Sequence, residues 1–376
     1  MKNKSGLFKI NFIYFILICA FVAVRILFSL DVIKLPDLAS DYIGSILIQV
    51  VIMFALPLML YMFLFKKKPK ETFKDFKYNK INFKAVLISI AIGVCVYIVT
   101  MFVGAIFSYI LALFGYSVSS SGTGEIGTWG GFLSSILLVA ILPAICEETA
   151  HRGLLMKGFS DLGATRTIIY SGLLFGLMHL NISQFFYATI VGCFLVVLVM
   201  SSGSIIPAMI VHFMNNFLSV YFSYAQDLNL PLKNAYSWFY GLISNMGILS
   251  ILMVVGIVAV CVFLIVLLTK ALFKQTYGKK FEKVKNEIAK EYLRDEVLGQ
   301  IESPNVGQGE AGLIFDEEVD IEGEKRVIKL KIPFERMGLE LKPKYKPTLL
   351  DNIFFYGSIA LGAVITIFTF IWGIVA

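Results

Sequence analysis

Two adjacent carboxylates, an arginine and all three histidines of this 376-residue chain fall within one short stretch: Glu147, Glu148, His151, Arg152, His179 and His212. The chain around them is apolar, with 58% hydrophobic and 16% charged residues. An ionisable side chain at the centre of a membrane span costs about 2.5–3.5 kcal/mol on insertion scales. A cluster of this kind therefore predicts an enclosed polar site in which a reaction takes place.

Helical spacing gives the two carboxylates different neighbours. Residues four apart share a helix face, so Glu148 lies beside Arg152 and the pair neutralises itself. Glu147, about 100° round the helix, is free to face a cavity as an acid or base, or to meet His151. Pro143 removes one backbone hydrogen bond just before this turn, which is expected to bend the helix. The alternative is that these charges mark a cytoplasmic helix end.

Two further polar patterns follow along the chain. His179 comes three residues after Gly176, which forms a small-xxx-small pair with Gly172 and allows helices to approach closely. His212 and Asn216 are four residues apart and project from one helical face. Taken alone, each pattern could consist of side chains that hydrogen-bond between helices rather than side chains that form a reaction site.

Jointly, these side chains are sufficient to activate water against a carbonyl group. Glu147 with His179 could take a proton from water, and His212 with Asn216 could donate hydrogen bonds to the developing oxyanion. The requirement is that all four meet at one depth. The predicted topology places Glu147 near the inner face and His179 towards the outer one. Either the span at 165–180 is re-entrant or tilted, or a boundary is wrong.

The elements that must position these residues are membrane helices. Apolar runs near the roughly 20 residues needed to cross a bilayer predict nine spans: 8–30, 43–65, 84–114, 129–150, 165–180, 184–201, 204–224, 243–270 and 353–375. Lysine-rich loops follow the second and eighth spans, which places the N-terminus in the cytoplasm and the C-terminus outside.

The charge and the cysteines exclude further classes of protein. The net charge of +7 comes from residues at span ends, where they set orientation and meet anionic lipid, so it does not indicate nucleic acid. The five cysteines lie singly inside apolar runs, which argues against a disulfide framework or a CxxC metal site. A multi-pass protein of the cell membrane is expected.

The fold class predicted is all-α, a multispanning helical membrane protein with about eight to nine transmembrane helices and a small α+β cytoplasmic insertion. Apolar residues at helical spacing over 281–293 predict an amphipathic helix, and alternation over 313–321 and 326–334 predicts a β-hairpin. The expected domains are N-terminal helices at 1–128, a catalytic core at 129–224, a transmembrane helix at 225–272, a cytoplasmic module at 273–350 and a final helix at 351–376.

Three motifs carry a family resemblance: Glu147-Glu148-x-x-x-Arg152, Phe175-x-x-x-His179 and His212-x-x-x-Asn216. In order, internal spacing and placement on successive helices, they resemble the signature of the CAAX-protease and bacteriocin-processing (CPBP) family, which includes the Rce1-type CAAX proteases. The resemblance covers about residues 130–222. It does not extend to the module at 273–350.

This resemblance implies an α-helical intramembrane endopeptidase. It also implies roles for the matched residues: water activation by Glu147 and His179, oxyanion stabilisation by His212 and Asn216, and support from Glu148 and Arg152. His151 occupies a position that the motif leaves open and receives no catalytic role. The implied partners are a peptide or membrane-associated protein substrate and the lipid bilayer.

Two alternatives stay open at the level of sequence. No metal or other cofactor is expected, but His179, His212 and a glutamate would make a His₂Glu set of the kind that holds catalytic zinc, although HExxH is absent. A non-catalytic immunity or scaffold protein could also be built on the same core. A transporter with a proton relay is less favoured because no inverted repeat is evident.

Overall fold

The computed structural model describes residues 2–30, 37–116, 127–244, 247–297, 312–321, 324–334, 336, 343–344 and 346–375. Its α-helices are α1 (Lys2–Ser29), α2 (Asp37–Ile46), α3 (Leu56–Phe65), α4 (Pro69–Asp75), α5 (Phe83–Leu113), α6 (Trp129–Ser135), α7 (Leu142–Glu148), α8 (Met156–Phe159), α9 (Ala164–Met178), α10 (Ile182–Ser202), α11 (Ile206–Tyr224), α12 (Lys233–Ser244), α13 (Ile248–Val297) and α14 (Leu349–Val375). π-Helical segments lie at Leu47–Ala55, Ile136–Ile141 and Thr149–Leu155, and a 3₁₀ turn lies at Ser160–Leu162. A hairpin of β1 (Gly312–Ile321) and β2 (Glu324–Pro333) completes the described fold.

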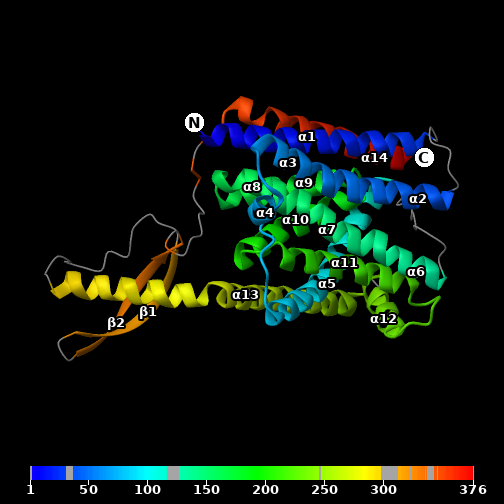
Figure 1. The fold of residues 1–376 in the computed structure, drawn as a ribbon. Coiled ribbons are helices and arrows are strands. Elements are labelled where there is room, and N and C mark those ends of the chain that lie inside the picture. Colours follow the sequence, from blue (N-terminus) through cyan, green and yellow to red (C-terminus); the bar gives the residue numbers. More distant parts are fainter. Residues whose placement is uncertain are drawn as a thin grey trace.

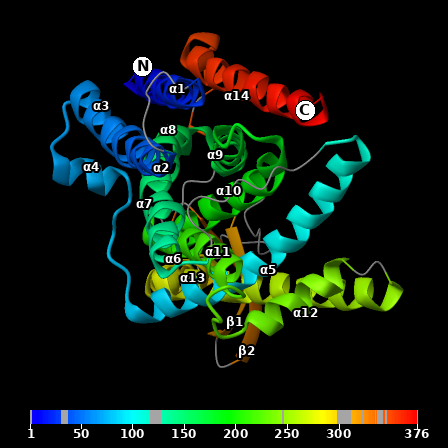
Figure 2. The same ribbon diagram turned by 90° about the vertical axis from the view of Figure 1, so that its right-hand side faces the viewer.

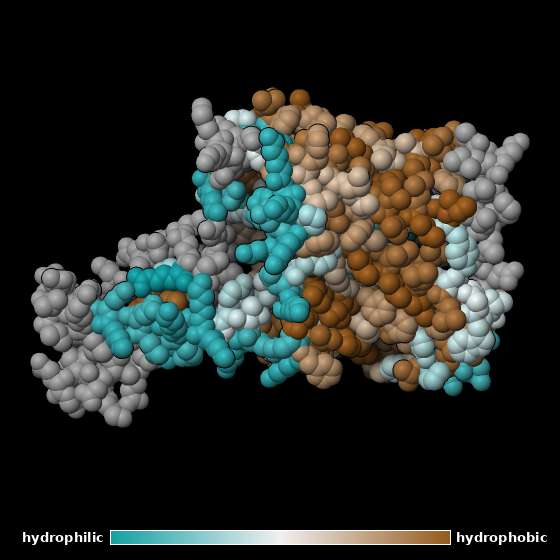
Figure 3. All heavy atoms as spheres, viewed as in Figure 1, coloured by the Kyte–Doolittle hydropathy of each residue, from teal (hydrophilic) through white to brown (hydrophobic). Residues whose placement is uncertain are grey.

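Apolar helices dominate the structure, which confirms a multispanning helical membrane protein. Within the described ranges, seven helices are long and apolar enough to cross a membrane: Gly6–Phe28, Tyr42–Phe65, Phe83–Leu113, Trp129–Leu162, Ile182–Ser202, Ile248–Glu291 and Leu349–Ile374. The two other predicted spans correspond to α9, a shorter apolar helix, and to α11. Figure 3 shows a brown hydrophobic belt bordered by teal residues near α4.

The helices form layers between two outer pairs of helices. In both ribbon views, α1 and α14 pair on one side of the bundle, and α5 and α13 pair on the opposite side (Figures 1 and 2). Between them, α9 packs against α10, and α11 packs against α5. Of the motif-bearing helices, α9 and α11 both pack against α10, and α7 packs against α11 while its Ile145 side chain is exposed.

The helix that carries the carboxylates is longer than the sequence predicted. Residues Trp129–Leu162 form one apolar helical stretch in which π-helical turns at Ile136–Ile141 and Thr149–Leu155 alternate with α-helix. The predicted end at residue 150 was wrong, because the following turns are apolar and buried, with Leu154 and Leu155 both 0% exposed. Glu147 consequently lies near the middle of this stretch rather than at a membrane face.

The helix that carries His179 is short. The 15 residues of α9 span about 22 Å, less than the roughly 30 Å of a bilayer core. His179 follows its last residue, and Leu180 then adopts a left-handed conformation (φ 51°) that turns the chain into α10. Its end therefore need not reach the opposite face, and the depth conflict with Glu147 is removed.

The predicted amphipathic helix and hairpin are both confirmed. The helix is the second half of α13, which runs for 50 residues without a break, so the predicted boundary at 272/273 falls inside it. The strands β1 and β2 pair antiparallel, with Gly312 opposite Pro333. They lie beside the end of α13 that projects from the bundle (Figure 1). The sequence did not predict α12.

Candidate active site

One cavity of about 340 Å³ collects the four residues of the predicted reaction site. Glu147 enters it from the end of α7, His179 from the end of α9, and His212 and Asn216 from α11. Its size falls in the range of small-molecule and peptide-side-chain pockets. His151 does not line this cavity. The structure thus brings together the side chains that sequence spacing alone could not place at one depth.

Behind the cavity lies a buried polar network centred on Glu148. Its Oε1 accepts a hydrogen bond from Arg152 Nη1 at 2.9 Å and another from His212 Nδ1 at 2.9 Å. Arg152 Nη2 donates to the backbone carbonyl of Gly192 at 3.0 Å, which ties α10 to the carboxylate helix. Because Glu148 and Arg152 are 0% and 1% exposed, neither charge has solvent as an alternative partner.

Phe175 is the apolar centre of the site. Its ring meets His179 and His212 edge to face, with centroids 5.1 and 5.7 Å away, and the guanidinium carbon of Arg152 lies 4.3 Å from its centroid. Its backbone carbonyl also accepts a hydrogen bond from His179 Nδ1 at 2.9 Å. The Phe-x-x-x-His spacing therefore serves to orient the imidazole, a role that the sequence pattern did not reveal.

The partners of Nδ1 fix which nitrogen of each histidine is left for the cavity. Nδ1 of His179 faces a carbonyl and Nδ1 of His212 faces the Glu148 carboxylate, so both must carry a hydrogen. Nε2 is the remaining ring nitrogen in each case. In the neutral form, Nε2 accepts a proton or hydrogen bond. It donates only when the ring is an imidazolium.

Glu147 is held between two polar neighbours. Its Oε1 accepts a hydrogen bond from Gln49 Nε2 at 2.8 Å, and its Oε2 lies 4.0 Å from His212 Nε2. The side chain of Glu147 is 16% exposed to solvent, whereas that of Glu148 is fully buried. The expected contact with His151 is made by the backbone carbonyl of Glu147, not by its carboxylate. That carboxylate is therefore available to the cavity.

A chain of amides and a hydroxyl holds Asn216. Its Nδ2 donates to the Val139 carbonyl at 3.0 Å, and its Oδ1 accepts from Asn215 Nδ2 at 3.2 Å. Thr100 in turn donates to Asn215 Oδ1 at 2.8 Å. These bonds use one of the two Nδ2 hydrogens and leave the other to donate. Gln49, Asn215 and Thr100 were not predicted, because their only signal in the sequence is a polar side chain inside an apolar run.

His151 lies outside the cavity, although its ring meets that of Phe175 edge to face at a centroid distance of 5.0 Å. Its Nδ1 bonds the Glu147 carbonyl at 2.8 Å, and its Nε2 lies 3.1 Å from the Tyr14 hydroxyl on α1. We expect Tyr14→Phe to destabilise the fold by about 1–3 kcal/mol, because it removes the buried partner of Nε2. Denaturant unfolding in detergent would measure this cost. A loss of activity per folded molecule would contradict the separation of His151 from the reaction site.

Close packing of α9 on α10 sets the position of His179. A Cβ at Gly176 would lie 2.7 Å from the Phe185 carbonyl and would also collide with Thr189, so no side chain fits there. We expect Gly176→Ala to push the helices apart and lower both stability and activity. Gly104→Ala is the matched control, because a Cβ there meets nothing within 4 Å and should be neutral or slightly stabilising. Equal unfolding temperatures of the two variants would contradict this account.

Comparison with known proteins supports the family resemblance. Residues 129–218 match the family model described as type II CAAX prenyl endopeptidase, Rce1-like. No curated protein and no solved structure matches the chain. The matched segment contains all three motifs and confirms the predicted resemblance. The protein is a multi-pass membrane protein, and the match supports a CAAX-type intramembrane protease in general terms.

Proposed function

We propose that this protein is an intramembrane endopeptidase that hydrolyses a peptide bond in a peptide or membrane-associated protein. The observation that carries the proposal is the convergence of Glu147, His179, His212 and Asn216 on one cavity, within the segment that matches the Rce1-like family. A carboxylate, two imidazoles and an amide supply both the proton acceptor and the hydrogen-bond donors that acyl hydrolysis needs.

In this proposal, Glu147 and His179 activate the water. The Glu147 carboxylate takes a proton from the water as the oxygen attacks the scissile carbonyl carbon, and His179 Nε2 accepts a hydrogen bond from the same water. The C–N bond then breaks, and the proton held by Glu147 passes to the leaving amine. Gln49 supports this role because its hydrogen bond orients the carboxylate without neutralising it.

His212 and Asn216 stabilise the oxyanion. Since Nδ1 of His212 already donates to Glu148, a second donation through Nε2 requires the imidazolium form. The contacts of the ring support that role, because one carboxylate oxygen lies 2.9 Å from Nδ1 and another lies 4.0 Å from Nε2. Asn216 adds its remaining Nδ2 hydrogen as the second donor.

We also propose that hydrolysis proceeds without a metal. Two ligands of a tetrahedral zinc lie roughly 3.3 Å apart, whereas His212 Nε2 and Glu147 Oε2 are 4.0 Å apart. Over the described part of the chain, no group of three His, Cys, Asp or Glu side chains is arranged to hold a metal ion. Activity should therefore survive chelator treatment, and metal analysis should find no stoichiometric zinc. Loss on chelation with recovery on zinc addition would favour the metalloprotease alternative.

The orientation proposed from charge places the N-terminus, the lysine-rich α4 region and the β-hairpin in the cytoplasm. Cysteine-accessibility labelling in intact cells would test it. A residue introduced beside Lys68 should be protected from an impermeant reagent, and labelling from outside would reverse the assignment.

Complementation of a deletion strain separates an enzyme from a non-catalytic scaffold or immunity protein. Glu147→Ala and His179→Ala should each fail to complement if the protein hydrolyses its substrate. Cys146→Ala is a matched control, because Cys146 is buried beside Glu147 but does not line the cavity. Full complementation by both site variants at normal expression would establish the scaffold function instead.

A further inference from the structure

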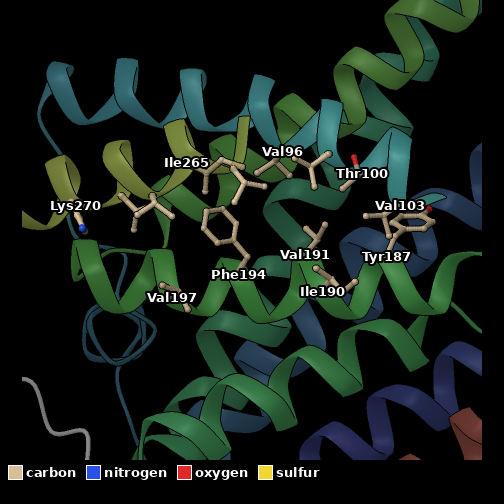
Figure 4. Close-up of a pocket in the computed structure, with 14 residues that line it drawn as sticks. Val96, Thr100, Val103, Tyr187, Ile190, Val191, Phe194, Val197, Ile265 and Lys270 are labelled. Atoms are coloured by element: carbon tan, nitrogen blue, oxygen red, sulfur yellow. The ribbon is translucent and has the colours of Figure 1, made fainter. Parts of the chain in front are cut away.

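A second, larger cavity lies next to the candidate active site. It has a volume of about 430 Å³ and is formed by α5, α10 and α13 (Figure 4). Valine and isoleucine side chains make up most of its wall, with Phe194 projecting into its middle. We call it the α5–α10–α13 groove. Between its two ends the lining carries no polar side chain and therefore suits a hydrocarbon.

The groove opens where the bundle is least covered. Only 11% of the most apolar window of α13 is buried in the fold, so this helix presents most of its apolar surface to the bilayer. Along α10 the groove reaches from Tyr187 to Val197, ten residues or about 15 Å. A bilayer core is about 30 Å thick, so this length corresponds to the depth of one leaflet. The dimensions match one acyl chain.

The two ends of the groove differ in chemistry. Lys270 closes one end, and beside it the Thr269 hydroxyl is buried with no hydrogen-bond partner among the described residues. Lys270 is also the first of several lysines that follow the apolar part of α13. Tyr187 and Thr100 lie at the opposite end (Figure 4). A cation at one mouth of an apolar channel complements a negatively charged head group on a hydrocarbon chain.

We propose that the α5–α10–α13 groove binds one acyl chain of an anionic phospholipid, with the head-group phosphate against Lys270 and Thr269. Charge complementarity selects the anionic lipid over a zwitterionic one. The leaflet-length apolar wall selects a lipid chain over a polar peptide. This inference concerns binding alone and does not rest on the proposed function.

The bound chain would touch the wall of the candidate active site. Tyr187 and Val191 line both the groove and the neighbouring cavity. Thr100 at the inner end of the groove donates to Asn215, which in turn donates to Asn216. An acyl chain in the groove therefore packs against the residues that hold the candidate oxyanion donor in place.

Photo-crosslinking tests the proposal directly. The purified full-length protein is placed in phosphatidylcholine nanodiscs with a small fraction of phosphatidylglycerol that carries a diazirine at the end of one acyl chain. Peptide mapping should find the label on α5, α10 and α13 around Tyr187 and Phe194. Val266→Trp should abolish that label by filling the groove. Leu267→Trp is the matched control, since Leu267 is equally exposed (44% against 45%) but does not line it.

The head-group contact is tested on the same helix. Lys270→Gln should lower labelling by phosphatidylglycerol about fivefold, as expected for one lysine at the membrane surface. Lys274→Gln, one turn further and outside the groove, should leave it unchanged. The proposal is overturned if a phosphatidylcholine probe labels the groove equally well, if labelling spreads evenly over the lipid-facing helices, or if Val266→Trp has no effect.

Discussion

Glutamine in place of Glu147 should reduce product formation by about 10²–10⁴-fold while leaving the fold intact. The size of this loss is what removal of a general base costs, since an amide cannot take a proton from water. The fold should survive because the side chain borders the cavity and its 2.8 Å bond to Gln49 is one that an amide can also make. Cleavage by purified protein and thermal unfolding in detergent measure the two quantities.

Gln49→Leu is the companion to that substitution. It leaves the carboxylate in place but removes its orienting donor, so we expect a smaller loss than with Glu147→Gln. Retained activity in well-folded Glu147→Gln protein would remove Glu147 from the proposed mechanism. An equally large loss in both variants with lowered unfolding temperatures would indicate a structural role for the pair.

Methionine in place of Arg152 should destabilise the protein by about 3–5 kcal/mol. The substitution leaves Glu148 as a buried carboxylate without its guanidinium partner, which is among the costliest changes in a protein interior. It also removes the bond to the Gly192 carbonyl and the contact with the Phe175 ring. Denaturant unfolding in detergent measures the loss.

The double variant Glu148→Gln/Arg152→Met tests the cause. Neutralising Glu148 removes the unpaired charge, so the double variant should be more stable than Arg152→Met alone. The coupling free energy between the two sites should reach about 0.5–3 kcal/mol, the range for residues in direct contact. Additive losses would show that the ion pair does not account for the effect of Arg152.

Much of the fold followed from local patterns. Long apolar runs gave most spans, and alternation gave the hairpin within a residue or two of β1 and β2. The depths of Glu147 and His179 along their helices did not follow from these patterns. The helix through Glu147 continues past residue 150 because apolar side chains there pack against α1 and α3, and hydropathy cannot distinguish such burial from a span end. The sequence left open whether the span that ends near His179 is re-entrant, tilted or wrongly bounded, and the structure favours a short helix of 15 residues.

The candidate site also contains residues that the sequence predicted and residues that it did not. Glu147, His179, His212 and Asn216 were predicted because each belongs to a spaced pattern, and the structure brings all four to one cavity. Gln49, Asn215 and Thr100 belong to no pattern. Gln49 and Thr100 are single polar residues in apolar runs, and Asn215 directly precedes the predicted Asn216. Gln49 bonds a partner 98 residues away, and Thr100 and Asn215, which bond each other, are 115 residues apart. Only the packed helices reveal these contacts.

Water activated in this cavity should supply an oxygen atom to the peptide bond that the protein hydrolyses. Membranes from a deletion strain that carries either the wild-type protein or Glu147→Gln are incubated in ¹⁸O-water, and the released peptides are analysed by mass spectrometry. We expect peptides with one ¹⁸O at a newly formed carboxyl terminus in the wild-type sample and none of them with Glu147→Gln. Identical peptide populations in the two samples would contradict it.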